Sequence, residues 1–117
     1  ITDAVHNSSH NIAYKCCSGH THKKNLRLIK ACDIYIDQLI IGSAGVSTFE
    51  ALAMGKIVLC NINNDGYDNT PIINVTKHNI HEILEQIIQL SLDEKIKIQM
   101  AGIEYIKTLQ KQQKLLI

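Results

Sequence analysis

The sequence predicts an α/β domain, a three-layer sandwich with a mainly parallel sheet. Short apolar runs alternate along the chain with helical patterns, and the runs are apolar on both faces, as strands covered by helices on each side are. One run is followed by a glycine-containing turn that leads directly into a helical pattern. With 117 residues, the chain is long enough for one domain of this Rossmann-like kind, spanning 1–117.

Charge and hydropathy exclude several classes of partner. The 12 Lys and Arg residues nearly balance the 11 Asp and Glu residues, so no basic excess points to nucleic acid or to an anionic membrane. No run approaches the roughly 18 apolar residues of a membrane span, and we expect no integral membrane segment. The chain begins at Ile1, and its first residues resemble the end of a helix. We therefore expect a fragment of a larger protein, incomplete at its N-terminus.

The four cysteines predict reduced thiols packed near the core of a cytoplasmic protein. They lie in or beside apolar segments rather than at the spacing of a disulfide framework. Cys16 and Cys17, followed by His20 and His22, have the side chains of a zinc site. Adjacent residues of a strand point to opposite faces of the sheet, however, so we expect no metal here.

The N-terminal half contains the first strands and helices. The apolar run 12–17 predicts a buried strand, and Thr21 predicts the N-cap of a helix over 22–31, with Leu26 and Ile29 facing inward. Alternation over 33–37 predicts a second strand.

A third strand and a second helix follow. The pattern over 46–54 predicts the helix, with Gly55 as its left-handed stop, and 56–60 reads as the strand. The apolar stripe predicted for this helix consists of Phe49, Leu52 and Ala53.

The C-terminal part is predicted to be mostly helical. A short strand over 71–75 follows a polar loop. A buried stripe then predicts one helix, and its members are Ile80, Ile83, Leu84, Ile87 and Ile88. Ser91 and Glu94 form a capping box that opens a last helix, which we expect to end near Gln112.

The segment 42–55 is the candidate ligand site. A glycine turn before a helix leaves backbone N–H groups around Gly45, Val46 and Ser47 free to bind a phosphate, aided by the helix dipole. Glu50 shares a face with Ser47 and is placed to accept hydrogen bonds from two ribose hydroxyls. The residues alone are equally consistent with a tight turn and a glutamate that complements the dipole.

The runs 31–38 and 45–56 resemble the C-terminal domain of retaining glycosyltransferases of the GT-B fold, group 1 type. The specific core is Gly-x-x-x-x-Glu-Ala-x-Ala-x-Gly over 45–55, and a looser similarity extends from Ile12 to Gln112. The resemblance implies that the domain binds a nucleotide diphosphate sugar. It assigns Glu50 to the ribose and the positions of Val46 and Ser47 to the diphosphate.

Two positions depart from the family pattern or are ambiguous within it. Gly42 stands where the family has its first glutamate, eight positions before Glu50, which contacts the sugar. Asp37 or Gln38 would take over part of that role unless Asp37 only caps the strand end. The resemblance also implies that His20, in the loop 19–22, lies near the base of the nucleotide. The residues themselves favour exposed loop histidines there.

The resemblance implies a parent enzyme that transfers a sugar from a nucleotide diphosphate donor to a glycan or lipid-linked acceptor, without a cofactor. Its acceptor site would come from a missing N-terminal domain, so we expect no turnover by the fragment, and surface exposed by that loss would favour self-association. A stand-alone binding or regulatory module is the alternative. A response-regulator-like fold is a third, and its candidate acidic residues are Asp33, Asp37 and Asp65.

Overall fold

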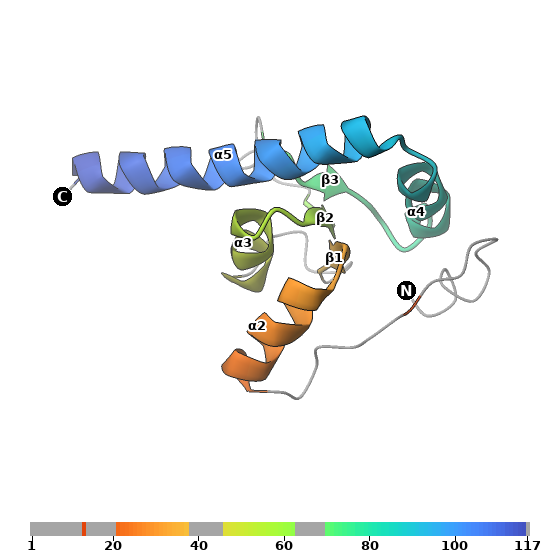
Figure 1. The fold of residues 1–117 in the computed structure, drawn as a ribbon, viewed down its shortest axis with the longest axis horizontal. Coiled ribbons are helices and arrows are strands. Elements are labelled where there is room, and N and C mark those ends of the chain that lie inside the picture. Colours follow the sequence, from red (N-terminus) through yellow and green to blue (C-terminus); the bar gives the residue numbers. More distant parts are fainter. Residues whose placement is uncertain (1–12, 14–20, 38–45, 63–69, 117) are drawn as a thin grey trace.

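The computed structural model describes residue 13 and residues 21–37, 46–62 and 70–116, and these contain three strands and four helices (Figure 1). The elements run in the order α2 (His22–Ala31), β1 (Ile34–Ile36), α3 (Val46–Ala53), β2 (Ile57–Cys60), β3 (Ile73–Asn74), α4 (Ile80–Ile88) and α5 (Leu92–Leu116). The strand predicted over 12–17 lies outside the described residues except for residue 13.

The strands form one parallel sheet in the order β1-β2-β3. Ile34 pairs with Ile57 across the first ladder, and Leu59 pairs with Ile73 across the second. The predicted parallel sheet is thus confirmed. The observed strands are shorter than predicted, and each lies inside its predicted range.

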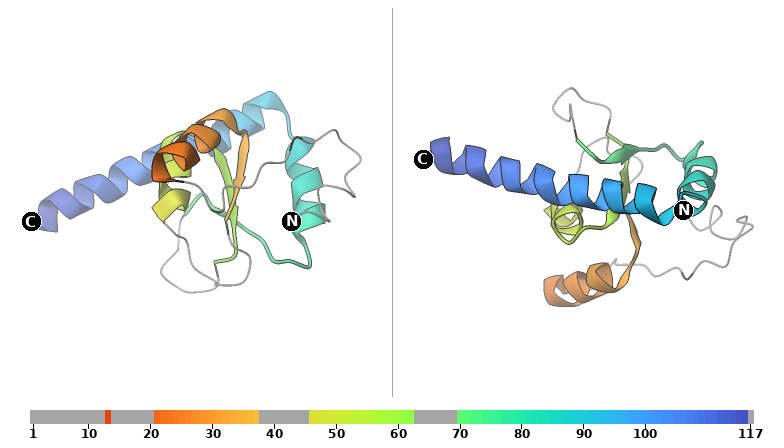
Figure 2. Two further views of the ribbon diagram at one scale, coloured as in Figure 1. Left: turned by 90° about the horizontal axis from the view of Figure 1, so that it is seen from below. Right: turned by 45° about the horizontal axis from the view of Figure 1, so that its top comes forward.

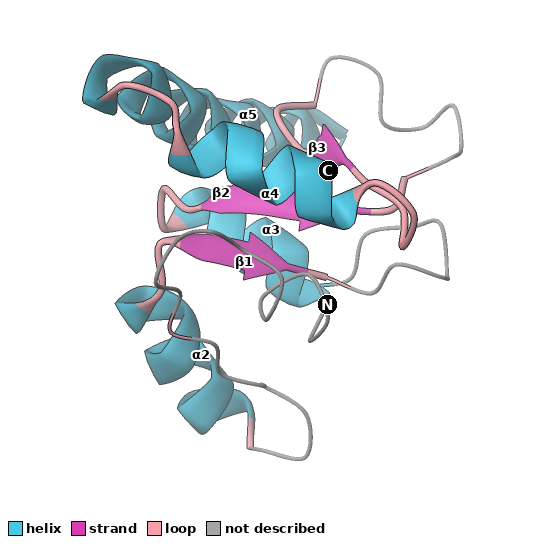
Figure 3. Ribbon diagram, turned by 90° about the vertical axis from the view of Figure 1, so that its right-hand side faces the viewer, coloured by secondary structure: helices cyan, strands magenta, loops and turns pink. Residues whose placement is uncertain are grey.

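Helices cover both faces of the sheet, which gives three layers (Figure 3). All four residues of β2 are buried, and they alternate between two core clusters. Ile57 and Leu59 pack in the cluster that contains residues of α4, whereas Val58 and Cys60 pack in the cluster that contains residues of α2 and α3. The three-layer α/β sandwich predicted from the doubly apolar runs is confirmed.

Helix α2 begins where its cap predicts. The Thr21 hydroxyl accepts a hydrogen bond from the backbone N–H of Lys24 at 3.2 Å, and Ile29 is buried in the core. At the other end, Lys56 Nζ donates to the backbone carbonyl of Lys30 at 2.9 Å. A cation at a helix C-terminus stabilises the unpaired carbonyl groups and the dipole.

Helix α3 ends at a turn in which Gly55 has φ +76°, as predicted. The predicted inward stripe was partly wrong. Leu52 is buried and Phe49 is half-buried, but Ala53 is exposed, and Thr48 and Ala51 are fully buried instead. Because α3 packs against the sheet and also against α2 and α5, its buried surface is rotated by about one residue from the stripe of apolar side chains.

Helices α4 and α5 agree with their predicted patterns, apart from one end. Glu94 N–H donates to Ser91 Oγ at 3.2 Å and Ser91 N–H donates to Glu94 Oε1 at 3.4 Å, which is the predicted capping box. Helix α5 continues to Leu116 instead of ending near Gln112. The residues after Gln112 are glutamine, lysine, leucine and isoleucine, which include strong helix formers and no stop signal.

The long helix α5 runs across α3 and extends beyond the sheet (Figures 1 and 2). Its close approach is made at Gly102, where an added Cβ atom would lie 3.2 Å from Leu52 Cδ2. Within the described part of the chain, no helix is both long and apolar enough to cross a bilayer.

Candidate ligand site at the carboxyl ends of the strands

The candidate site lies at the edge of the sheet where the parallel strands end. Helix α3 follows β1 along the chain, so its N-terminus lies at the carboxyl end of that strand. Helix α2 leads into the amino end of β1, and its own N-terminus therefore lies toward the same edge. Open α/β sheets bind their ligands at this edge.

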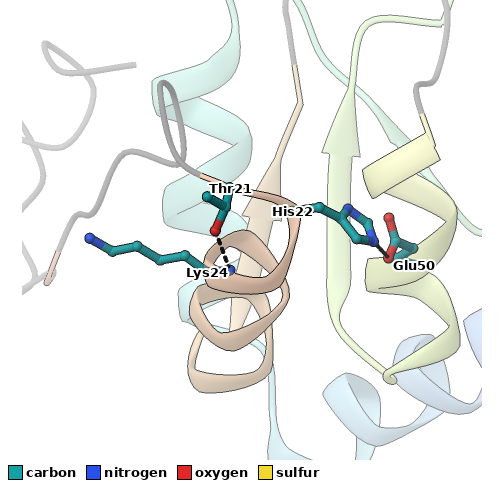
Figure 4. Close-up of polar contacts among 4 residues, drawn as sticks. All are labelled: Thr21, His22, Lys24 and Glu50. Atoms are coloured by element: carbon teal, nitrogen blue, oxygen red, sulfur yellow. Dashed lines mark hydrogen bonds and ion pairs between the residues drawn. The ribbon is translucent and has the colours of Figure 1, made fainter.

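His22 and Glu50 meet across this edge. His22 Nε2 lies 3.4 Å from Glu50 Oε2, and Figure 4 shows the imidazole of α2 directed at the carboxylate of α3. The His22 side chain is 68% exposed and that of Glu50 is 24% exposed, so the contact sits at the border between solvent and core. His22 belongs to the first turn of α2 rather than to the loop before it.

One oxygen of the Glu50 carboxylate lacks a donor. Oε1 is buried and has no hydrogen-bond partner among the residues that the structure describes, and the same holds for Oδ1 of Asn25 on α2. A buried acceptor left unpaired costs about 1–3 kcal/mol, so both oxygens favour a hydrogen-bond donor from a bound molecule or water.

The backbone at the start of α3 is oriented for an anion. The helix begins at Val46, so the N–H groups of its first turn, including that of Ser47, have no partner within the helix. Its first turn carries no acidic side chain. Ser47 and Glu50 are both half-buried. The predicted site residues Gly45 and His20, as well as Gly42 and Gln38, lie outside the described residues.

Asp37 joins the end of β1 to α3. Thr48 Oγ1 donates a hydrogen bond to Asp37 Oδ2, and the backbone N–H of Asp37 donates to the carbonyl oxygen of Leu59 at 2.9 Å. These contacts support the role of a strand-end cap, which the sequence left open beside a role in sugar binding. The Thr48 hydroxyl is fully buried, so Asp37 is held within the fold.

Cys60, the last residue of β2, lies near enough to Asp37 for its thiol to be affected by the charge of that carboxylate. Burial raises the pKa of the Cys60 thiol to about 11, and the negative charge of Asp37 adds to the effect. A thiol with so high a pKa stays protonated at neutral pH and is a poor nucleophile and a poor metal ligand.

The described part of the chain supports neither a metal site nor the acidic site of a response-regulator-like fold. It contains no group of three His, Cys, Asp or Glu side chains placed to hold a metal ion. Asp33 and Asp37 flank β1 at its opposite ends, so they do not form the acidic cluster of a response-regulator-like fold. Asp65, Cys16 and Cys17 lie outside the described residues.

Comparison of the chain with protein-family models, with curated proteins and with solved structures finds no match. The case for a function therefore depends on the fold, on the geometry of the site and on the motif over 45–55.

Two polar residues of this region have only a weak signal in the sequence. Thr48 lies beside the predicted apolar stripe of α3, and only its spacing from Ala51 and Leu52 suggests that it is buried. Asn25 lies three residues after His22, on the same side of α2 as the buried Ile29. A helical projection anchored on Ile29 would have placed Asn25 toward α3.

Proposed function

We propose that this chain is the donor-binding domain of a retaining nucleotide-sugar glycosyltransferase of the GT-B type. In the full-length protein it would present a nucleotide diphosphate sugar to a glycan or lipid-linked acceptor held by a further, N-terminal domain. We also propose a cytoplasmic location, because the cysteines lie in or beside apolar segments rather than at the spacing of a disulfide framework.

The observation that carries the proposal is the Glu50 carboxylate, one turn inside α3 at the carboxyl edge of a parallel sheet. One of its oxygens is buried without a donor. A ribose supplies neighbouring hydroxyl donors, and a carboxylate oxygen accepts hydrogen bonds from such groups. The N–H groups of Val46 and Ser47 would face the diphosphate, whose charge suits the positive end of the helix dipole.

Asp37 has a different role in the proposal from that of Glu50. Because Thr48 donates a hydrogen bond to its carboxylate, Asp37 would position α3 relative to β1. Asp37 would then affect sugar binding indirectly, without touching the sugar.

The test is calorimetric titration of the chain with UDP and with GDP, for wild type, Glu50→Gln and Glu82→Gln. Glu82 lies in the first turn of α4, on the opposite face of the sheet, and provides the matched control. We expect Glu50→Gln to weaken nucleotide binding by about tenfold or more and Glu82→Gln to leave it unchanged. Binding that is equal in all three proteins would refute the ribose assignment and would favour the stand-alone module.

A further inference from the structure

Helix α2 carries two polar side chains, His22 and Asn25, that have no role in the proposal above. His22 contacts Glu50 of α3, and helical spacing puts Asn25 on the same face of α2 as His22. The contact between His22 Nε2 and Glu50 Oε2 joins the two helices at this point. Ile29, two turns after His22, packs in the same core cluster as Ala51 and Leu52 of α3.

Asn25 lies between these two contacts on the same side of α2. It follows His22 by three residues and precedes Ile29 by four, and residues at these spacings share one helix face. Its Oδ1 atom is buried without a partner among the described residues, as is Oε1 of Glu50. One buried acceptor thus lies on the face of α2 that carries His22 and Ile29, and a second belongs to Glu50 of α3, with no donor to either among the described residues.

We infer that Asn25 and His22 complete the binding site of Glu50 and that the three side chains together bind the vicinal diol of the ligand's ribose. His22 holds Oε2 of the carboxylate, which leaves Oε1 and Asn25 Oδ1 as acceptors for two hydroxyl donors. The inference rests on the proposed function, and it adds two specificity-determining residues on a helix outside the 45–55 motif.

The chemistry of the cluster favours a diol over a phosphate or a metal ion. The two open acceptors are a carboxylate oxygen of Glu50 and the amide oxygen of Asn25, and both repel an anion. The diphosphate therefore belongs elsewhere, at the N–H groups of α3. A metal ion would compete with the imidazole at Glu50, and the described residues offer no third ligand of the His, Cys, Asp or Glu type. A neutral group with two adjacent O–H donors fits the remaining acceptors.

The test compares UDP with its 2′,3′-dideoxy analogue, which keeps the base and the diphosphate but lacks both ribose hydroxyls. Affinities are measured for wild type, His22→Ala, Asn25→Ala and Lys24→Ala. Lys24 is the control because it lies in the same helical turn and its side chain points away from Glu50 (Figure 4). We expect wild type and Lys24→Ala to prefer UDP by about tenfold, and the other two variants to lose most of that preference.

Thermal unfolding of the free variants separates a binding role from a purely structural one. If Asn25 Oδ1 is unpaired in the free protein, Asn25→Ala leaves the melting temperature unchanged or raises it while weakening UDP binding. If the Asn25 amide is instead turned so that it donates to Glu50, Asn25→Ala lowers the melting temperature and leaves the UDP preference intact, which would overturn the inference.

The remaining outcomes distinguish this inference from the proposed function. UDP binding that requires Glu50 but is unaffected by His22→Ala and Asn25→Ala leaves the proposed function standing and overturns the inference. If wild type binds no nucleotide, the proposed function fails, and methyl β-ribofuranoside then tests the cluster alone. A shift of the His22 ring resonances on adding the ribofuranoside supports the diol site, and unchanged resonances overturn it.

Discussion

The buried hydroxyl of Thr48 donates a hydrogen bond to the carboxylate of Asp37, eleven residues earlier in the chain. The contact links the carboxyl end of β1 to the first turn of α3, and so it sets where the helix starts relative to the sheet. Glu50 lies two residues further along α3. The position of the candidate ligand site therefore depends on a pair of polar side chains at the border of the core.

We expect Thr48→Val to destabilise the protein by about 1–3 kcal/mol, because the substitution keeps the shape of the fully buried side chain but removes its hydrogen bond to the half-buried Asp37 carboxylate. Denaturation by urea, followed by circular dichroism, measures the change. Thr108→Val is the control, since the Thr108 hydroxyl donates to the Glu104 carbonyl on the exposed face of α5. The control should change stability by less than about 0.5 kcal/mol, and equal losses in the two variants would contradict the role of the Asp37 contact.

The elements that the sequence predicted well are those with a local chemical signal. Thr21 marks the start of α2, Ser91 and Glu94 mark the start of α5, and Gly55 marks the end of α3, because each acts through backbone groups within four residues. The alternation of apolar runs was likewise enough to predict the parallel, three-layer sandwich.

The features that the sequence could not fix depend on tertiary packing. The exposure of Ala53 and the burial of Thr48 follow from the position of α3 among three neighbours, which no single helical stripe encodes. The pairing of His22 with Glu50 joins residues 28 positions apart, and neither carries a local signal for the other. The ligand assignments of Glu50, Val46 and Ser47 remain predictions.

Gly102 allows α5 to pack closely on α3, and we expect Gly102→Ala to destabilise the protein by about 1–2 kcal/mol. The new Cβ atom would lie 3.3 Å from the backbone oxygen of Leu52, which cannot move aside as a side chain can. Alanine is intrinsically the better helix former by about 1 kcal/mol, so a loss of stability would show that the contact outweighs propensity.

The neighbouring exposed position measures propensity without the contact. Ala101→Gly should destabilise α5 by about 1 kcal/mol through helix propensity alone. The packing argument is wrong if Gly102→Ala raises the free energy of unfolding by the amount that Ala101→Gly lowers it, because propensity would then explain both results.

Gly55 turns the chain from α3 into β2 in a left-handed conformation. We expect Gly55→Ala to cost about 1–2 kcal/mol, because φ is +76° there, while Gly55→Asn should cost less, since asparagine tolerates this region. Ile103 Cδ1 lies 3.2 Å from an added Cβ atom and is the flexible end of a side chain, so strain in the backbone is the larger effect. Equal costs for alanine and asparagine in urea denaturation would argue for the steric contact instead.

Ionisation of the Cys60 thiol makes the free energy of unfolding depend on pH in the alkaline range. Its pKa is raised to about 11 in the folded protein, first by burial and then by the charge of Asp37, against 9.0 for an unperturbed thiol. Between these two values the unfolded chain loses the proton while the folded protein keeps it. The unfolded state binds fewer protons in this range, so the free energy of unfolding falls as pH rises.

We therefore expect the stability difference between wild type and Cys60→Ala to shrink as pH rises from 8 to about 10.5. At pH 8 the variant is less stable because it loses a buried sulfur atom from a core position. As pH approaches 10.5, ionisation of this thiol lowers the free energy of unfolding of wild type only. The loss is at most about 1.4 kcal/mol for each unit by which the pKa in the folded protein exceeds that in the unfolded chain. A difference that stays constant across this range would show that Cys60 ionises as readily in the folded protein as in the unfolded chain.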